Sequence, residues 1–175
     1  MGVEYVSRVP RPPLDGLIDD LYYLEGASPY ARLTLPPMPG AFLIVNLGAP
    51  FRIRAGTDIE TAEYADGCVV TTPTRAWEFG YPPRTRSVGV HFKPWGPAPF
   101  LPMPAAELCD RPVTLEQVWD RPAIAELRDR LATAGRPQTC SSGTGRSASS
   151  AAGTGRNGAG PHGLKCTPTD RVRGG

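Results

Sequence analysis

The sequence is short of the residues that most often carry catalysis or cross-links. Its 175 residues include two histidines and four cysteines, and no two cysteines have the C-x-x-C spacing of a metal or redox site. The cysteines therefore predict reduced thiols rather than a disulfide framework. The longest apolar run, AFLIV at 41–45, is far too short to span a bilayer. Since the N-terminus also lacks the pattern of a secretory signal, we expect a soluble cytoplasmic protein with no membrane partner.

The patterns that mark common active sites are also scarce. A catalytic metal site needs about three imidazole or carboxylate ligands from neighbouring strands, yet the first 134 residues contain one histidine, His91. There is no GxSxG nucleophile motif and no GxxxxGK[ST] phosphate loop. Cys68 and Cys109 lie beside apolar residues and are interpreted as small core side chains. We therefore expect no catalytic residue, no metal, no cofactor and no enzymatic activity.

Residues 135–175 have almost no large apolar side chains. They hold 10 of the 20 glycines and lack Phe, Trp, Tyr, Ile and Met entirely. Such a segment can bury too little surface to offset the entropy of ordering it, which predicts a disordered low-complexity tail. Its net charge is near +5, against about −3 for residues 1–134. The short repeats GTGRS and GTGRN have no strand before them and are interpreted as low complexity.

The rest of the chain has the pattern of short β-strands. Segments rich in β-branched and aromatic residues are separated by Gly, Pro and Asp turns, which favours an antiparallel barrel or sandwich over βαβ units. The segments are LYYLEG, YARLTL, AFLIVNLG, FRIRAG, CVVTTP, RAWEFGYP and RSVGVHFKP. AFLIVNLG is apolar on both faces, as expected of a strand buried on both sides. In FRIRAG, Phe51 and Ile53 are expected to point inward, with Arg52 and Arg54 outward.

Helical patterns flank the strands. Leucines and an isoleucine at helical spacing in residues 14–21 predict a short helix before the first strand. Thr114 and Gln117 form the pattern of a capping box. In DRPAIAELRDRLATAG, Asp120 is a candidate N-cap and Gly135 a C-terminal stop, and an apolar stripe lies between them. Members of that stripe are Ile124, Leu127 and Leu131. The expected fold is mainly β with α, a small antiparallel cupin-like barrel followed by a short helical segment.

Aromatic residues gather on adjacent predicted strands, where they form either the core or the wall of an apolar pocket. Trp77 and Tyr81 alternate with Phe79 and should share its environment. His91 lies on the face of its strand opposite Val88, Val90 and Phe92, and faces either solvent or the interior of the barrel. The candidate ligand-binding residues are Trp77, Tyr81, His91 and Trp95.

A longer series of segments supports a resemblance to a known family. LYYLEG, PPMPGAFLIVNLGAPF and VGVHFKPWGPAPFLPMPAAELCDRPVTLEQVW, the last at residues 88–119, resemble the N-terminal sensor domain of AraC-type transcriptional regulators. The resemblance implies a cupin-like barrel that senses a small-molecule effector or mediates dimerisation. It divides the chain into an N-terminal arm (1–13), the sensor domain (14–134) and the tail (135–175).

The chain departs from that family after residue 134. AraC-type regulators continue into two helix-turn-helix motifs that bind DNA, whereas this tail lacks the apolar periodicity of even one helix. We interpret the tail as the product of a frameshift near codon 134; the other interpretation is a genuine basic tail that holds nucleic acid weakly. The expected function is a truncated sensory and dimerisation domain without sequence-specific DNA binding. The alternatives are a small cupin-like metalloenzyme and a product without function.

Overall fold

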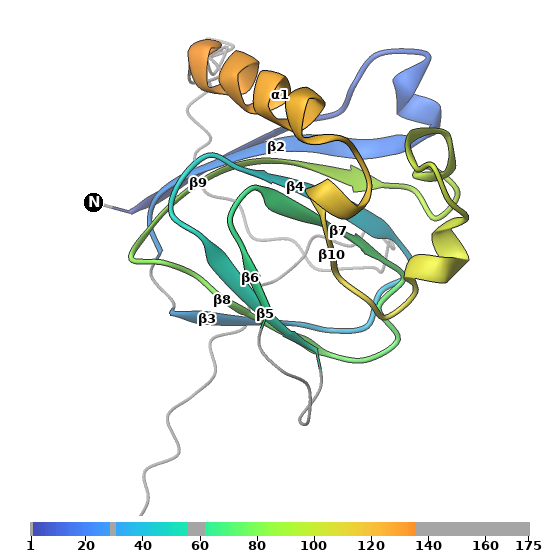
Figure 1. Ribbon diagram of the computed structural model, residues 1–175, viewed down its shortest axis with the longest axis horizontal. Helices are drawn as coiled ribbons and strands as arrows, with labels where there is room; N and C mark the ends of the chain where they lie inside the picture. Colours follow the sequence, from blue (N-terminus) through green and yellow to red (C-terminus); the bar gives the residue numbers. More distant parts are fainter. Residues whose placement is uncertain (1, 29–30, 56–61, 136–175) are drawn as a thin grey trace, which may run out of the picture. The chain divides into compact units, whose positions relative to one another are not determined.

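Two antiparallel β-sheets face each other in the computed structural model, which describes residues 2–28, 31–55 and 62–135 (Figure 1). One sheet has the strand order β1-β2-β9-β4-β7-β10 and the other has the order β3-β8-β5-β6. We call them sheet A and sheet B. All of their strand pairings are antiparallel. Sheet A consists of β1 (Val3–Arg8), β2 (Ile18–Ala27), β9 (Arg84–Phe92), β4 (Ala41–Asn46), β7 (Gly67–Thr71) and β10 (Val113–Thr114). Sheet B consists of β3 (Arg32–Leu35), β8 (Trp77–Gly80), β5 (Phe51–Ala55) and β6 (Ala62–Tyr64).

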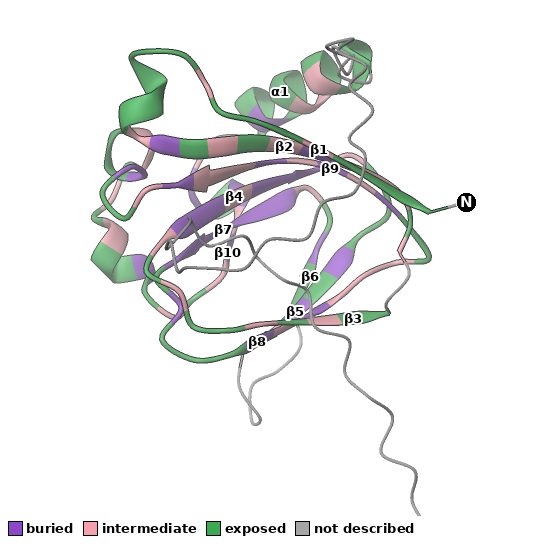
Figure 2. Cartoon of the chain, turned by 180° about the vertical axis from the view of Figure 1, so that it is seen from behind, coloured by how far each residue is buried: buried purple, intermediate pink, exposed green. Residues whose placement is uncertain are grey.

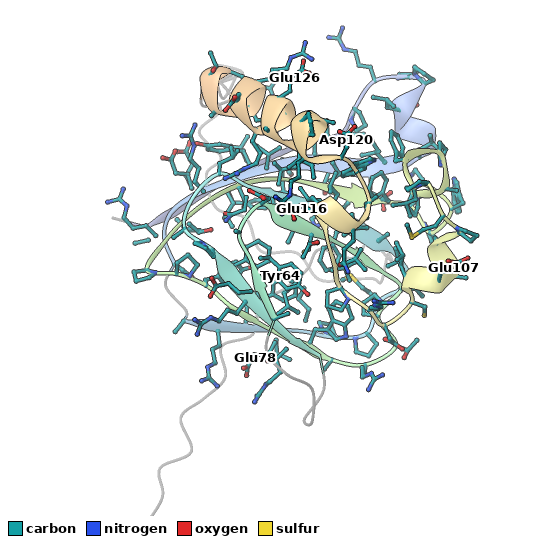
Figure 3. All side chains as sticks on the ribbon, viewed as in Figure 1. Tyr64, Glu78, Glu107, Glu116, Asp120 and Glu126 are labelled. Atoms are coloured by element: carbon teal, nitrogen blue, oxygen red, sulfur yellow. The ribbon has the colours of Figure 1, made fainter. Side chains whose placement is uncertain are left out.

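The main core lies between the sheets because each sheet turns its alternate apolar residues toward the other. In β8, for example, Trp77 and Phe79 are buried while Glu78 is only half-buried, as the two-residue period of a strand requires. Figure 3 shows Tyr64 pointing between the sheets and Glu78 pointing away from them. The buried members of this cluster are Phe42, Ile44, Phe51, Ile53, Tyr64, Cys68, Val70, Trp77 and Phe79.

Strand β4 is buried on both faces, as its continuous apolar run predicts. Phe42 and Ile44 belong to the core between the sheets, whereas Val45 and Leu43 pack on the opposite side with the C-terminal segments of the domain. In Figure 2, β4 and its neighbour β7 are buried over most of their length. Sheet A is therefore covered on one side by sheet B and on the other by the helical segments.

The helical segments are shorter than the sequence pattern predicts. The helix expected over residues 14–21 is a single 3-10 turn, η1 (Leu14–Gly16), because the chain enters β2 at Ile18. The proline-punctuated region forms η2 (Ala98–Phe100) and η3 (Ala105–Leu108), and the capping box of Thr114 and Gln117 begins η4 (Leu115–Gln117). The only α-helix among the described residues is α1 (Arg121–Thr133).

Helix α1 begins and ends where the sequence indicates. The Asp120 side chain accepts a hydrogen bond from the Ala123 backbone N–H at 2.9 Å, and Gly135 follows the helix with φ +70°. Ile124 is buried in the second apolar cluster, which also contains Val69, Leu115 and Val118.

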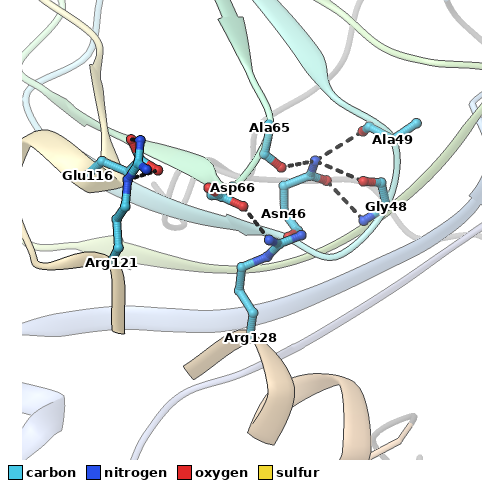
Figure 4. Close-up of polar contacts among 8 residues, drawn as sticks. All are labelled: Asn46, Gly48, Ala49, Ala65, Asp66, Glu116, Arg121 and Arg128. Atoms are coloured by element: carbon cyan, nitrogen blue, oxygen red, sulfur yellow. Dashed lines mark hydrogen bonds and ion pairs between the residues drawn. The ribbon is translucent and has the colours of Figure 1, made fainter. Parts of the chain in front are cut away.

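Polar contacts also fix α1 to the outer face of sheet A (Figure 4). Arg128 Nε donates to the Asn46 carbonyl at 2.9 Å, and the Arg128 guanidinium pairs with Asp66. The buried Asn46 amide in turn donates to the carbonyls of Gly48, Ala49 and Ala65 at 3.2, 3.0 and 2.8 Å. One arginine thus connects the helix to the two turns that flank β4 and β7.

These features confirm the expected fold class, a mainly β fold with antiparallel sheets followed by a short helical segment. The segment 1–13, expected to be an arm, contributes β1, which pairs along its length with β2. Cys68 is a fully buried core residue as predicted, but the same prediction for Cys109 is wrong. That side chain is exposed because it lies in the turn after η3, where its thiol donates to the Thr72 carbonyl at 3.4 Å. The disorder predicted for the tail concerns residues 136–175, which lie outside the described part of the chain.

Candidate functional site

Sheet A places polar residues on the face that it turns toward sheet B. The register aligns Asp20 of β2 with His91 of β9, and His91 with Phe42 of β4. Because side chains of paired residues share a face, Asp20 and His91 lie on the same inner face as the core residue Phe42. His91 therefore faces the interior, one of the two positions that its strand pattern allows.

The polar residues form an ordered cluster rather than isolated side chains. Asp20 Oδ1 lies 2.9 Å from His91 Nδ1. The Tyr22 ring stacks on the imidazole with centroids 4.8 Å apart, and the Tyr5 ring stacks on Tyr22 at 5.7 Å. We call these four residues the inner-face cluster. The side chains of His91 and Asp20 are 26% and 29% exposed, and Tyr5 is 52% exposed, so solvent molecules can reach the cluster from the β1 side.

Gly89 creates the space that the stacked rings occupy. It lies opposite Tyr22 in the register of β2 and β9. A Cβ atom at Gly89 would lie 2.1 Å from Tyr22 Cζ, far inside van der Waals contact. The phenol of Tyr22 therefore lies flat over a position that only glycine leaves open. A glycine in the middle of an apolar strand pattern often marks a place where another group lies close to the backbone, and here that group is the Tyr22 ring.

The electrostatic setting keeps the Tyr22 phenol neutral. Burial raises its pKa, and the nearby Tyr81, Cys68, Tyr5 and Asp20 raise it further. Tyr81 directly follows β8 of sheet B, and its ring stacks on Phe79 of that strand with centroids 6.2 Å apart. A neutral phenol in this position can donate and accept hydrogen bonds but adds no charge.

The structure brings together only part of the predicted ligand-binding set. Trp77 is 1% exposed and belongs to the core, where its indole N–H has no hydrogen-bond partner. Tyr81 is partly buried and packs against the same core. Trp95 lies elsewhere: it is 64% exposed in the turn after β9, and its Nε1 donates to the Gly16 carbonyl at 2.9 Å.

The ligand-binding residues predicted from the sequence do not include Asp20, Tyr22 or Tyr5. A signal for the first two exists, since Asp20, Tyr22 and Leu24 alternate along one strand and should share a face. Because the prediction assigns residues 14–21 to a helix, it does not use the strand alternation of Asp20 and Tyr22. Tyr5 belongs to a segment interpreted as an arm, and nothing in its sequence shows that it stacks on Tyr22.

A second feature lies on the opposite, outer face of sheet B. A hollow of about 430 Å³ there is lined by charged side chains that pair across the strands. Glu78 lies 3.4 Å from Arg32 and 3.3 Å from Arg54, and Arg52 lies 3.1 Å from Glu63. Cross-strand ion pairs of this kind are common on the solvent-exposed face of a sheet and do not by themselves indicate a binding site. The outward direction of Arg52 and Arg54 confirms the alternation read from FRIRAG.

Among the described residues, no group of three or more His, Cys, Asp and Glu side chains is placed to hold a metal ion. No helix of the described part of the chain is long and apolar enough to cross a membrane.

The fold and the cluster define a small two-sheet antiparallel β domain with a polar, aromatic site on the inner face of one sheet. The chain belongs to the family described as "Domain of unknown function (DUF6597)", which matches residues 7–114. No match was found among curated proteins.

Two solved structures are similar to this chain. One, from Salmonella typhimurium LT2, is described as an ethanolamine utilization protein Q (EutQ); the similarity has 18% identity and a TM-score of 0.37, covering 51% of this chain and 68% of that one. The other is a conserved protein of unknown function from Streptococcus pyogenes, with 18% identity and a TM-score of 0.36, covering 54% of this chain and 80% of that one. Scores this low bear on neither ligand nor activity.

Buried phenols make the domain sensitive to alkaline pH. Burial raises the pKa of Tyr22, and it raises that of Tyr64 to about 12, whereas an unfolded chain ionises both near 10. Above pH ~10 the unfolded state therefore loses these protons first, so stability is fully present below that pH and falls as pH rises toward 12. We expect the urea midpoint to fall across this range, and to fall less in Tyr64→Phe. Ionisation of every tyrosine near pH 10 in the folded protein, followed by phenolate absorbance, would contradict this.

Proposed function

We propose that this domain is the sensor of an AraC-type transcriptional regulator and binds a small-molecule effector at the inner-face cluster. The observation that supports the proposal is the Asp20–His91 pair stacked against Tyr22 on the inner face of a β domain. The facing strands bury mainly apolar side chains, and a purely structural interior needs no carboxylate. A partly exposed set of hydrogen-bonding groups beside aromatic rings is typical of small-molecule sites.

A fragment screen by two-dimensional NMR tests the ligand part of this proposal. Fragments that bind are expected to shift the resonances of His91 and Tyr22. His91→Gln is expected to lower the affinity for those fragments at least tenfold while leaving the fold intact. Trp95→Ala is the matched control, since Trp95 is 64% exposed in the turn after β9 and its indole N–H donates to the Gly16 carbonyl rather than to a residue of the cluster. Binding confined to the outer face of sheet B, or no binding at all, would contradict the proposal.

Self-association is the second part of the proposal, and α1 offers a surface for it. Ile124 is 4% exposed and packed into the domain, whereas Leu127, on the same helix, is 37% exposed. We expect Leu127→Asp to shift a dimer toward monomer while the circular dichroism spectrum is unchanged. Ile124→Asp, which buries an unpaired charge, is expected to unfold the domain instead. Sedimentation of the wild-type chain as a monomer at all concentrations would contradict dimerisation through this surface.

The link to transcription depends on what the gene encodes beyond the domain. Reading the coding DNA past codon 134 in its other two frames is expected to yield the apolar periodicity of helix-turn-helix segments. If neither frame contains such a pattern, the frameshift interpretation fails and the regulator proposal loses its DNA-binding half. The ligand proposal is tested separately by the fragment screen, so the two parts can fail independently.

A further inference from the structure

The inner-face cluster contains one carboxylate, and the described strand positions of sheet A place no arginine or lysine on the same face. Among the described strand residues, Asp20 is the only ionisable carboxylate at an inner-face position of sheet A, and no such position holds Lys or Arg. The arginines of these strands take the alternate, outward positions; Arg86, for example, reaches the Ala132 carbonyl of α1 at 3.4 Å. The inner face of sheet B contributes apolar side chains and tyrosines.

One lysine lies near the end of the cluster, but a separate carboxylate pairs with it. Lys93 Nζ lies 3.1 Å from Asp19 Oδ1, at the irregularity in β2 where the register shifts between Ile18 and Asp20. Asp19 and Lys93 therefore form one pair, and Asp20 and His91 form the next. The two carboxylates and the single ammonium leave this end of the sheet with an excess of negative charge when the imidazole is neutral.

Both polar members of the cluster present hydrogen-bond acceptors. A carboxylate accepts hydrogen bonds, so His91 Nδ1 donates to Asp20. In a neutral imidazole that carries its proton on Nδ1, the other ring nitrogen, Nε2, is an acceptor, and it has no hydrogen-bond partner among the described residues. A ligand that donates hydrogen bonds can therefore satisfy Asp20 and His91 together, whereas an anion would meet acceptors on both.

The aromatic members suit the same kind of ligand. The rings of Tyr5, Tyr22 and His91 stack in series, and Tyr5, at the outer end of the series, remains 52% exposed. The negative faces of aromatic rings attract cations, most strongly where water is partly excluded. A carboxylate, a ring nitrogen acceptor and two phenol rings in one partly exposed place form a recognition set for positive charge.

We propose that the effector of this site is a small organic cation, an amine whose ammonium group is recognised by Asp20 and His91 and whose apolar part lies against Tyr5. This inference rests on the proposed small-molecule site and adds the charge class of its ligand. We expect carboxylates and phosphates to bind poorly, because the described inner-face positions of the strands hold no arginine or lysine and the neighbouring Lys93 already pairs with Asp19.

Three probes of nearly equal size and different charge test this inference on the full chain: 2-phenylethylamine, 2-phenylethanol and 3-phenylpropionate. Binding is followed by NMR shifts of Tyr22 and by titration calorimetry. We expect the amine to bind at least tenfold more tightly than the alcohol and the propionate to give no shift. Asp20→Asn should lower the affinity for the amine at least tenfold and bring it close to that of the alcohol.

Asp19→Asn is the matched control, since it removes a neighbouring carboxylate that pairs with Lys93 and lies outside the cluster. It should leave the affinity for the amine within about twofold. Equal or tighter binding of the alcohol or the propionate at Tyr22 would overturn the charge class while leaving a small-molecule site in place. An equal loss of affinity in Asp19→Asn and Asp20→Asn would also overturn it. Absence of binding by all three probes would overturn this inference, and the fragment screen would then decide whether the proposed site stands.

Discussion

Replacing Trp77 with alanine is expected to lower the free energy of unfolding by about 3–5 kcal/mol, the usual cost of deleting a large aromatic side chain from a core. Trp77 is 1% exposed and packs in the cluster between the sheets. The small domain has a total stability on the order of 5–15 kcal/mol, so this single change removes a large share of it. Urea denaturation followed by circular dichroism measures the effect.

Trp95→Ala is the matched control for this prediction. The same substitution at Trp95 removes a side chain that is 64% exposed and makes one hydrogen bond to the Gly16 carbonyl. We expect a loss of at most about 1 kcal/mol, as for an ordinary hydrogen bond at a surface. Equal losses in the two variants would contradict the assignment of Trp77 to the core and of Trp95 to the surface.

Gly89→Ala is the second change with a large expected effect, and it acts on both stability and binding. The added methyl group would lie 2.1 Å from Tyr22 Cζ, so the phenol has to leave its place against His91. Overpacking of this kind costs about 1–3 kcal/mol. We also expect the variant to lose at least tenfold in affinity for any ligand of the inner-face cluster, because the stack that forms the site is broken.

Gly80→Ala provides the comparison, since Gly80 also lies in a strand but has room for a side chain. There the nearest atom to an added Cβ is Arg52 Cβ at 3.7 Å, an ordinary contact. Removing a glycine from a strand lowers the entropy of the unfolded chain, so stability should be unchanged or slightly increased. A Gly89→Ala variant as stable as Gly80→Ala would show that the Tyr22 ring does not depend on the gap.

Much of the fold could be predicted because the strand pattern is local and strong. The double-sided burial of β4, the alternation in FRIRAG and the cap at Asp120 each depend on neighbours in sequence, which the sequence shows directly. The prediction of a helix over residues 14–21 is wrong because it also depends on local spacing alone. Apolar residues at 14, 17, 18 and 21 fit a helical period, but pairing of β2 with both β1 and β9 outweighed that local preference.

The candidate site was predictable only at His91. Alternation places it opposite Val88, Val90 and Phe92, but only its pairing with Phe42 shows that this face is the inner one. Its partner Asp20 is 71 residues away in the chain and becomes its neighbour only through the register of β2 and β9. Trp77 and Trp95 show what the sequence leaves open for aromatic residues. Both are tryptophans near the same predicted strands, but one is the largest fully buried side chain and the other lies in an exposed turn. Residue type alone cannot separate a core aromatic from a surface one.

Strand β4 is buried on both faces, so only its backbone separates the core between the sheets from the cluster beneath α1. Phe42 is the register neighbour of His91, and the next residue, Leu43, packs into the cluster that holds Ile124. Strand β4 therefore contacts the core between the sheets with one face and the cluster beneath α1 with the other. We expect a substitution at Phe42 to disturb both sides of the sheet, because the two faces share one backbone.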